Sequence, residues 1–499
     1  MTHANTEILT QFEDLCAKRK EEILNAKDEI VITGTTYYVS TSGNDGNDGK
    51  TPETAWKTLE KVSNAELKEG DGVRFCRGDL FRGYFITKPG VTYAAYGEGE
   101  KPKFYGWIEN LADPSVWELY DESHNIWKYR KSITDCGSLV FEGGKQHSRK
   151  LIPSYKNGKF VCRDDESRDF VMQDEMTKDL DIVCFYTERL TTQEFDGESF
   201  PIPFIDHESY GELYLRCDKG NPGEVFSDIE AIVAGTIVRI WSHANVTVDN
   251  LCLKYCCFAV SGGGHVAGLH VSNCEIGWIG GNIQHYYGTD PNYPQGKRGT
   301  VTRFGNGIEI YGGCEDYIIK NCYIYQSYDA GVTHQITTCG NTIKLEDIYY
   351  LDNVIEYCVY GIEYFLNKTE GDVTSKIKNC EMAGNIIRYS GYGWGQQRHN
   401  TNTPAHIKGW SYENTAENYS VHDNHFGPAA YRMLHLVAKE PESCPKMWNN
   451  TYIQNMGKTL GQYGANKETE PEILPFDENA QEYIENIFCD KDAKVYGIK

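Results

Sequence analysis

An asparagine recurs among short apolar segments through the second half of the chain. The segments NVTVDNLCLKY and DYIIKNCYIY show the pattern, in which apolar and polar residues alternate around the asparagine. A unit of this size cannot bury its apolar face alone and must stack on neighbouring units. The asparagines are separated by 23 to 48 residues and stand at Asn250, Asn273, Asn321, Asn353, Asn385 and Asn424.

A right-handed parallel β-helix, an all-β solenoid, accounts best for this repeat. Its strands stack about 4.8 Å apart, and alternate side chains point into the core. A recurring Asn in a turn can then form a ladder of side-chain amide hydrogen bonds, and insertions confined to turns explain the irregular intervals. A β-propeller or a sandwich is the alternative, although the repeats lack the four-strand rhythm of a propeller blade.

We expect five segments along the chain. Residues 1–30 read as an amphipathic helix that caps one end of the solenoid, because unpaired edge strands must be covered. Residues 31–106 supply the first coils. The repeat fades over residues 107–236, where hairpin-like pieces such as GSLVFEGGKQ predict an inserted β-sandwich-like module. Residues 237–440 form the main parallel β-helix with the active-site groove, and residues 441–499 form the last coil and an outer tail.

Charge and cysteine content restrict the partners and the compartment. The net charge is -23, which argues against nucleic acid, a membrane surface or a polyanionic substrate and suits a neutral glycan. The 17 cysteines show no Cys-x-x-Cys pair, so we expect free structural thiols, no metal and no cofactor. Free thiols, and the lack of a signal-like or membrane-spanning segment, predict a cytoplasmic protein. A homo-oligomer is possible.

Several longer motifs resemble a known family. Residues 37–62 read YYVSTSGNDGNDGKTPETAWKTLEKV, residues 70–83 read GDGVRFCRGDLFRG, and later motifs include YDAGVTHQ, GIEYF and GWGQQRH. They are similar to bacterial right-handed parallel β-helix glycoside hydrolases, in particular the β-xylosidase-like group with an inserted β-sandwich module. The resemblance implies a fold and a broad class of activity, and it names no particular sugar.

Three carboxylates stand where a sugar-cleaving site would need them. Aligning the segments GIEIY, GVTHQ and GIEYF on their glycines puts Glu309 and Glu363 in one outward column, and Asp329 lies in the turn before the middle strand. Glycoside hydrolysis uses one protonated and one ionised carboxyl group. We expect Asp329 to act as nucleophile or base, Glu363 as general acid, and Glu309 as a substrate ligand or alternative partner. Each could instead be an ordinary exposed carboxylate. Because neither Asp329 nor Glu363 should be a core residue, we expect Asp329→Asn and Glu363→Gln to lower turnover by several orders of magnitude while thermal stability stays near that of the wild type.

Polar and aromatic residues near these carboxylates are candidates for substrate binding. The segment GWGQQ is read as the next strand of the same face, and strict alternation points His334 inward, where it could be a core histidine. A Gly-, Pro- and Tyr-rich insert over residues 281–304 is expected to wall the groove. The substrate-binding candidates are His334, Gln335, Tyr364, Trp394, Gln397, Arg398, His399, His406 and Trp410.

These features predict a glycoside hydrolase that cleaves a neutral oligosaccharide, such as a plant-cell-wall or xylan-derived glycan. A polysaccharide lyase or uronate epimerase is the second reading, and a non-catalytic glycan-binding β-helix is the third. A lyase needs a basic residue and a cation to neutralise the uronate, whereas the predicted groove is rich in carboxylates. Neutralising the three carboxylates separates the classes, because a binding module should survive it.

Overall fold

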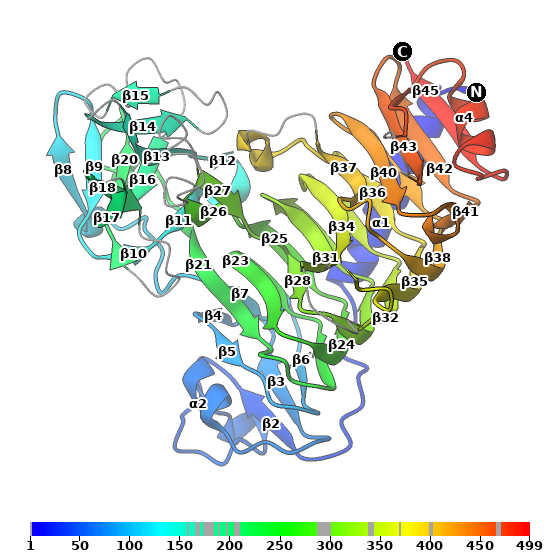
Figure 1. Cartoon of the computed structure of the whole chain (residues 1–499). Helices are drawn as coiled ribbons and strands as arrows, with labels where there is room; N and C mark the ends of the chain where they lie inside the picture. The colour runs from blue at the N-terminus through cyan, green and yellow to red at the C-terminus, as the bar shows by residue number, and fades with distance from the viewer. Residues whose placement is uncertain are drawn as a thin grey trace.

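The computed structural model describes residues 2–499 with eleven gaps, and most of these residues lie in strands (Figure 1). Its largest sheets are built from parallel strands, as predicted. The gaps comprise residues 157–158, 165–169, 173–183, 188–189, 196–197, 204–209, 287–300, 338–343, 369–370, 399–402 and 466–470.

Three ladders of parallel strands form the body of the molecule, and from β24 onward the chain visits them in a fixed order. The ten-strand ladder forms one face. Its members, in hydrogen-bonded order, are β2 (Thr36–Val39), β3 (Gly72–Cys76), β6 (Thr92–Tyr96), β22 (Val246–Asp249), β24 (Val266–Ser272), β29 (Cys314–Lys320), β32 (Lys344–Leu351), β35 (Lys376–Ala383), β38 (Ala416–His422) and β41 (Lys446–Trp448).

The other two ladders share β23 (Cys252–Gly263). The short-strand ladder continues through β25 (Glu275–Ile279), β30 (Tyr323–Ser327), β33 (Val354–Glu356), β36 (Ile386–Arg388), β39 (His425–Phe426), β42 (Thr451–Asn455) and β45 (Lys494–Ile498), and on the other side of β23 it pairs with β7 (Lys103–Tyr105) and β4 (Leu80–Arg82). The site ladder runs from β5 (Phe85–Ile86) through β21 (Ile229–Arg239), β23, β28 (Ile308–Tyr311), β31 (Ala330–Thr337), β34 (Tyr360–Asn367), β37 (Ala405–Gly409), β40 (Arg432–Ala438) and β43 (Thr459–Ala465).

One apolar core fills the space between the ladders, because alternate residues of each strand point into it. On the site ladder the inward column is fully buried and consists of Val260, Ile308, Val332, Ile362, Ile407 and Leu434.

The repeated asparagines fall into two adjacent columns rather than one. Asn353 and Asn385 are buried, and the amide of each donates to the next member of the column, Asn385 and Asn424, at 2.9 Å. This predicted ladder therefore exists. Asn273 and Asn321 lie one position earlier, where the backbone is left-handed with φ of 53°. Asparagine tolerates that conformation better than most residues, so the two columns share a residue type for different reasons.

The predicted N-terminal helix is present as α1 (Thr6–Leu24), but it does not cover an end of the ladders. Its apolar face, which includes Phe12 and Cys16, packs on the side of the short-strand ladder against Val354 and Ile386. The expectation of an end cap is thus corrected: a helical apolar period shows that one face is buried and says nothing of what buries it.

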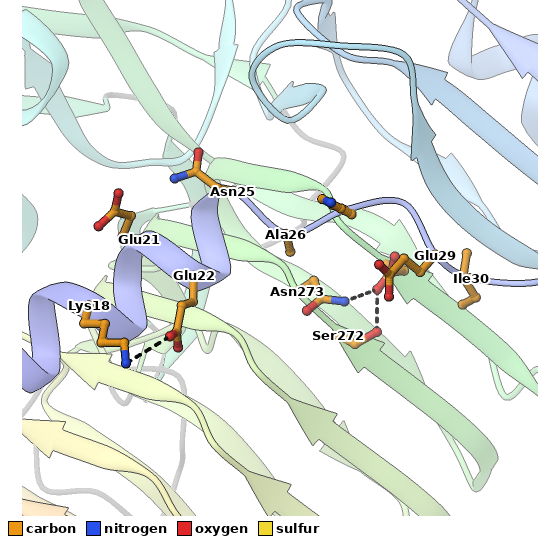
Figure 2. A pocket seen from close by; sticks show the side chains of 11 residues that line it. Lys18, Glu21, Glu22, Asn25, Ala26, Glu29, Ile30, Ser272 and Asn273 are labelled. Atoms are coloured by element: carbon orange, nitrogen blue, oxygen red, sulfur yellow. Dashed lines mark hydrogen bonds and ion pairs between the residues drawn. The ribbon is translucent and has the colours of Figure 1, made fainter.

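The C-terminal end of α1 lies over the turns that follow β22 and β24 (Figure 2). Here Ser272 and Asn273 both donate to the buried carboxylate of Asp249, at 2.6 and 2.8 Å. The exposed pair Lys18 and Glu22 faces this turn from the helix. Asn250, in the turn after β22, donates to the Ala26 carbonyl just beyond the helix at 2.9 Å, which ties the chain after α1 to the ladders.

Two other helices cover the ends of the core. Leu59 and Val62 of α2 (Leu59–Asn64) are buried in it beside β3. At the opposite end Ile484 of α4 (Ala480–Asn486) is buried in the same core (Figure 1). The tail expected to lie outside the fold instead supplies core residues and β45, and β45 pairs with β1 (Thr2–His3) at the other end of the chain.

An antiparallel region stands to one side of the ladders, at the upper left of Figure 1. Within the described residues it contains a seven-stranded sheet with one parallel pair and two two-stranded pairs. The sheet order is β15 (Phe170–Met172), β14 (Lys159–Asp164), β13 (Arg149–Lys156), β16 (Cys184–Thr187), β20 (Leu213–Arg216), β9 (Ile126–Tyr129) and β8 (Trp117–Asp121); the pairs are β10 (Ile133–Thr134) with β19 (Tyr210–Gly211) and β17 (Leu190–Phe195) with β18 (Glu198–Pro203).

A pair of neighbouring antiparallel strands, the first of this region and the second of the site ladder, connects this region to the ladders. β11 (Cys136–Phe141) runs antiparallel to β21 and also pairs with β12 (Gln146–His147), and the short helix α3 (Pro222–Val225) precedes β21. None of the helices that the structure describes is long and apolar enough to cross a membrane.

Candidate active site

A cavity of about 450 Å³ opens on the outer face of the site ladder, and the three predicted carboxylates all line it. Its remaining walls come from β23, from β28 and from the hairpin of β26 (Asn282–Tyr286) and β27 (Val301–Phe304). The lining residues are Ser261, Gly262, Gly263, Gln284, Phe304, Asn306, Glu309, Tyr311, Asp329, Gln335, Glu363 and Phe365.

The register of the site ladder is the one that the glycine alignment predicts. Ile308 pairs with Val332, and Thr333 pairs with Glu363. Glu309, which follows Ile308, therefore lies in the same outward column as Thr333 and Glu363. Two strand spacings separate the glutamates, about 9–10 Å at the backbone.

Asp329 lies in the turn that precedes β31 and is 7% exposed. Two contacts fix this turn: the backbone N–H of Ala330 donates to Asn306 Oδ1 at 2.8 Å, and the backbone N–H of Tyr360 donates to the Asp329 carbonyl at 3.1 Å. The carboxylate forms an ion pair with Arg398, whose Nη1 donates to Oδ1. Burial raises the pKa of Asp329, and the Arg398 guanidinium opposes that rise.

Glu363 is 6% exposed and accepts a hydrogen bond from the indole N–H of Trp410. Lys408 is its neighbour on β37, and its Nζ lies 4.0 Å from the centroid of the Trp410 ring. Burial, with the nearby charge of Asp329, raises the pKa of Glu363 to about 8. At neutral pH this carboxyl therefore carries a proton.

Glu309 accepts a hydrogen bond of 2.6 Å from the side-chain amide of Asn306. Burial is the main cause that raises its pKa to about 7, and the Asp329 charge adds to it. Asn306 thus contacts both the Asp329 turn and Glu309. Asn306 is not among the predicted site residues because it lies outside the aligned columns; its place in GNG, just before the aligned strand, is the signal that the sequence offers.

The arrangement places neighbouring carboxyls in different environments. Asp329 raises the pKa of both glutamates through its negative charge, while Arg398 stabilises that charge. Pairs of carboxyls whose environments divide them in this way can supply an acid and a base at one pH. The described residues contain no group of three or more His, Cys, Asp or Glu side chains placed to hold a metal ion.

Two of the predicted binding residues, Gln335 and Trp410, lie at the site. Gln335 lines the cavity, is 6% exposed and, among the described residues, has no hydrogen-bond partner for its Oε1. Trp410 is half-buried over Glu363. Arg398, a third predicted binding residue, also lies at the site, because it forms an ion pair with the Asp329 carboxylate.

Three other candidates lie in the interior of the fold, which corrects their assignment to the groove. His334 and Tyr364 stack on each other with ring centroids 5.3 Å apart, and the Tyr350 hydroxyl bonds His334 Nδ1 at 2.9 Å. His406 is fully buried and bonds Ser390 and the Gly427 carbonyl. The inward direction of His334 and Tyr364 follows from strand alternation, because they lie two residues after the inward Val332 and Ile362. His406 directly precedes the inward Ile407, so alternation does not predict its burial. Burial lowers the pKa of His334 to about 3 and that of His406 to about 4.

The segment GWGQQ was predicted to be the next strand of this face, and that prediction is wrong. Residues Trp394–Gln397 form a 3-10 helix, and β37 pairs with β34 instead. Trp394 is fully buried against Tyr328, and Gln397 accepts from the backbone N–H of Lys150 and donates to the Ser148 carbonyl. These residues hold Arg398 and the antiparallel region in place rather than binding substrate.

The remaining two predictions fall wholly or partly outside the described residues. His399 is not described. Of the insert over residues 281–304, residues 287–300 are not described, but Gln284 and Phe304 on the flanking strands do line the cavity.

Comparison with protein sequences gives a short match. No family model matches the chain. A stretch of 121 residues, 22% of the chain, is 29% identical to the lacto-N-biosidase of Bifidobacterium longum subsp. longum. The match covers 7% of that enzyme, so the chain spans only a small part of the curated relative that it resembles.

Comparison with solved structures gives distant neighbours. A complex of XylC with xylose is 12% identical, with 93% of this chain and 82% of that chain covered and a TM-score of 0.39. A GH136 lacto-N-biosidase from Eubacterium ramulus is 13% identical, with coverages of 99% and 71% and a TM-score of 0.37. A structure described as a glycoside hydrolase has coverages of 85% and 88% and a TM-score of 0.38. Since these TM-scores lie below 0.5, the likeness carries no argument about this chain.

Proposed function

We propose that this protein is a glycoside hydrolase whose three ladders wind as a right-handed parallel β-helix and carry the catalytic groove on the outer face. The observation that carries the proposal is the cavity lined by both Asp329, which is ion-paired with Arg398, and Glu363, whose pKa is raised to about 8. A cavity built only for binding has no need of a buried acid beside a buried carboxylate.

Asp329 and Glu363 divide the chemistry between them. Glu363 gives its proton to the glycosidic oxygen, so that the bond from that oxygen to the anomeric carbon breaks and the leaving sugar departs as an alcohol. Asp329, whose ionised form is favoured by the ion pair with Arg398, either attacks the anomeric carbon or takes a proton from the attacking water. Glu309 and Gln335 supply hydrogen bonds to sugar hydroxyls along the same wall.

The substrate is a neutral oligosaccharide. The net charge of -23 and the carboxylate-rich cavity disfavour a polyanionic glycan. The names of the compared proteins suggest which sugars to try first, namely xylosyl units and the lacto-N-biosyl disaccharide.

A panel of aryl glycosides tests the proposal. It contains β-xyloside, lacto-N-bioside, β-galactoside, β-glucoside and α-arabinofuranoside, and release of the aryl alcohol is measured with the wild-type protein. We expect turnover of at least one member and its loss in Glu363→Gln. Cleavage of a uronate polymer with formation of an unsaturated, ultraviolet-absorbing product would instead identify a lyase and contradict the proposal.

A further inference from the structure

A second cavity, of about 400 Å³, opens beside the first on the N-terminal side of the site ladder. It lies where β21 meets the coils of β5 and β7 and the antiparallel region. Its lining residues are Gly83, Tyr84, Gly106, Trp107, Ile108, Thr134, Val233, Ala234, Gly235, Thr236, Ile237, Arg239 and Cys256.

The two cavities lie on one continuous face. Arg239 of the second cavity pairs in register with Ser261 of the catalytic cavity, and Ser261 pairs with Glu309. Arg239 is therefore two strands from Glu309 in the same outward column, about 10 Å at the backbone. This distance is on the scale of a disaccharide.

The opposite direction along the ladder is closed. Beyond Glu363 the outward column continues through Lys408 and His435, which are 3% and 6% exposed. Trp410 covers Lys408 on that side. Along this column of the described residues, a glycan held in the catalytic cavity can therefore extend toward Arg239.

Arg239 is presented to the second cavity with its donors available. Its guanidinium carbon lies 3.4 Å from the centroid of the Tyr84 ring, and its Nε donates to the Thr236 carbonyl at 3.3 Å. Within the described residues no carboxylate lies within ion-pair distance of Arg239. The planar group is thus held by two contacts, and Arg239 lines the cavity, where a guanidinium can bond a pair of oxygens.

Further features leave this volume open and polar. A Cβ placed on Gly83 would meet no atom within 4 Å, and one on Gly235 would meet only Nη2 of Arg239, at 3.7 Å. Thr134 lines the cavity and is 7% exposed, and its buried hydroxyl has no hydrogen-bond partner in the described part of the chain. Tyr84 and Ile108 are 48% and 63% exposed beside it, so apolar surface is also available to a sugar ring.

We infer that the second cavity is a distal sugar-binding subsite, in which Arg239 and Thr134 bond hydroxyl oxygens of a unit removed from the cleaved bond. This inference rests on the proposed function and deepens it, because the substrate is then an oligosaccharide chain rather than a short glycoside.

The test compares long and short substrates. Once the aryl-glycoside panel identifies the sugar, kcat/KM is measured for its monosaccharide glycoside and for an oligosaccharide ending in the same sugar. In Arg239→Gln and in Thr134→Val we expect the ratio of long to short kcat/KM to fall about tenfold, as expected for one lost hydrogen bond to a charged or buried group. Trp448→Ala is the matched control, since Trp448 is an exposed aromatic stacked on His422 of the ten-strand ladder. An unchanged ratio in both variants would overturn the subsite.

Binding decides the matter if the wild-type protein cleaves nothing, an outcome that would sink the proposed function alone. Xylohexaose and lacto-N-tetraose are then titrated by saturation-transfer NMR. Weaker binding in Arg239→Gln than in Trp448→Ala supports the subsite. Equal binding in the two variants, or no binding of either glycan by the wild-type protein, overturns it.

Discussion

At the scale of single residues, the site depends on one cation. Arg398 pairs with Asp329, and Asp329 in turn raises the pKa of Glu363. The guanidinium therefore favours the ionised form of Asp329 against the effect of burial. It also changes one expectation from the sequence: Asp329→Asn should not leave stability near that of the wild type, because it leaves a buried guanidinium without its partner, at a cost of about 3 kcal/mol or more.

Replacing Arg398 tests this division. In Arg398→Gln the positive charge that lowers the pKa of Asp329 is lost, so a higher pH is needed to ionise that carboxyl. We expect the acidic limb of the kcat/KM profile to move to higher pH, whereas Arg398→Lys, which keeps the charge, should move it less. An acidic limb at the wild-type position in Arg398→Gln would refute the role of the pair.

The raised pKa of Glu363 predicts how stability depends on pH. The folded protein holds this proton up to about pH 8, whereas an ordinary glutamate loses it near 4.5. The protonated Glu363 therefore contributes fully to the stability of the folded state below pH 4.5. This contribution is lost as the pH rises to about 8. Glu363→Gln has no such proton to lose, so its melting temperature should gain on the wild type between pH 4.5 and pH 8. A difference that stays constant with pH would contradict the shift.

At the scale of structural elements, the asparagine ladder couples successive coils. The Asn385 amide donates to the Tyr350 carbonyl and to Asn424, and its oxygen accepts from Asn353. Asn385→Ala leaves several of these buried groups unpaired, so we expect the free energy of unfolding to fall by about 3 kcal/mol or more. Urea denaturation measures this, with Asn321→Ala as the control.

Asn321 lies in the same column as Asn273, where its half-buried side chain donates a hydrogen bond to Asn273. Its replacement forfeits mainly the tolerance of a left-handed backbone, about 1 kcal/mol. Equal losses of unfolding free energy in the two variants would show that the column of Asn353, Asn385 and Asn424 has no special part in joining the coils.

The sequence predicts which helices and strands form better than it predicts what each of them packs against. Strand period and glycine spacing are local signals, so the parallel ladders and the shared column of Glu309 and Glu363 follow from them. The 3-10 turn at Trp394 depends on its burial against Tyr328, which lies far away in sequence, and no local pattern encodes that contact. For the same reason α1 could be predicted as a helix while its packing site could not.

At the scale of the whole molecule, the cysteines act as small core residues. Every cysteine whose side chain the structure describes is free, and most are buried. We expect thiol titration of the denatured, unreduced protein to find 17 thiols per chain. A count several lower would show native disulfides and contradict the predicted reducing compartment.

The most direct test of the whole account is kcat/KM for Asp329→Asn and Glu363→Gln on the substrate that the panel identifies. If these two carboxyls perform the cleavage, each variant should lose activity by about a thousandfold or more, a barrier increase of about 4 kcal/mol. Glu315→Gln, which neutralises a half-buried carboxylate of β29 outside the cavity, should retain wild-type activity. Retention of more than about a tenth of wild-type activity by both site variants, a loss of barely 1.4 kcal/mol, would contradict the assignment.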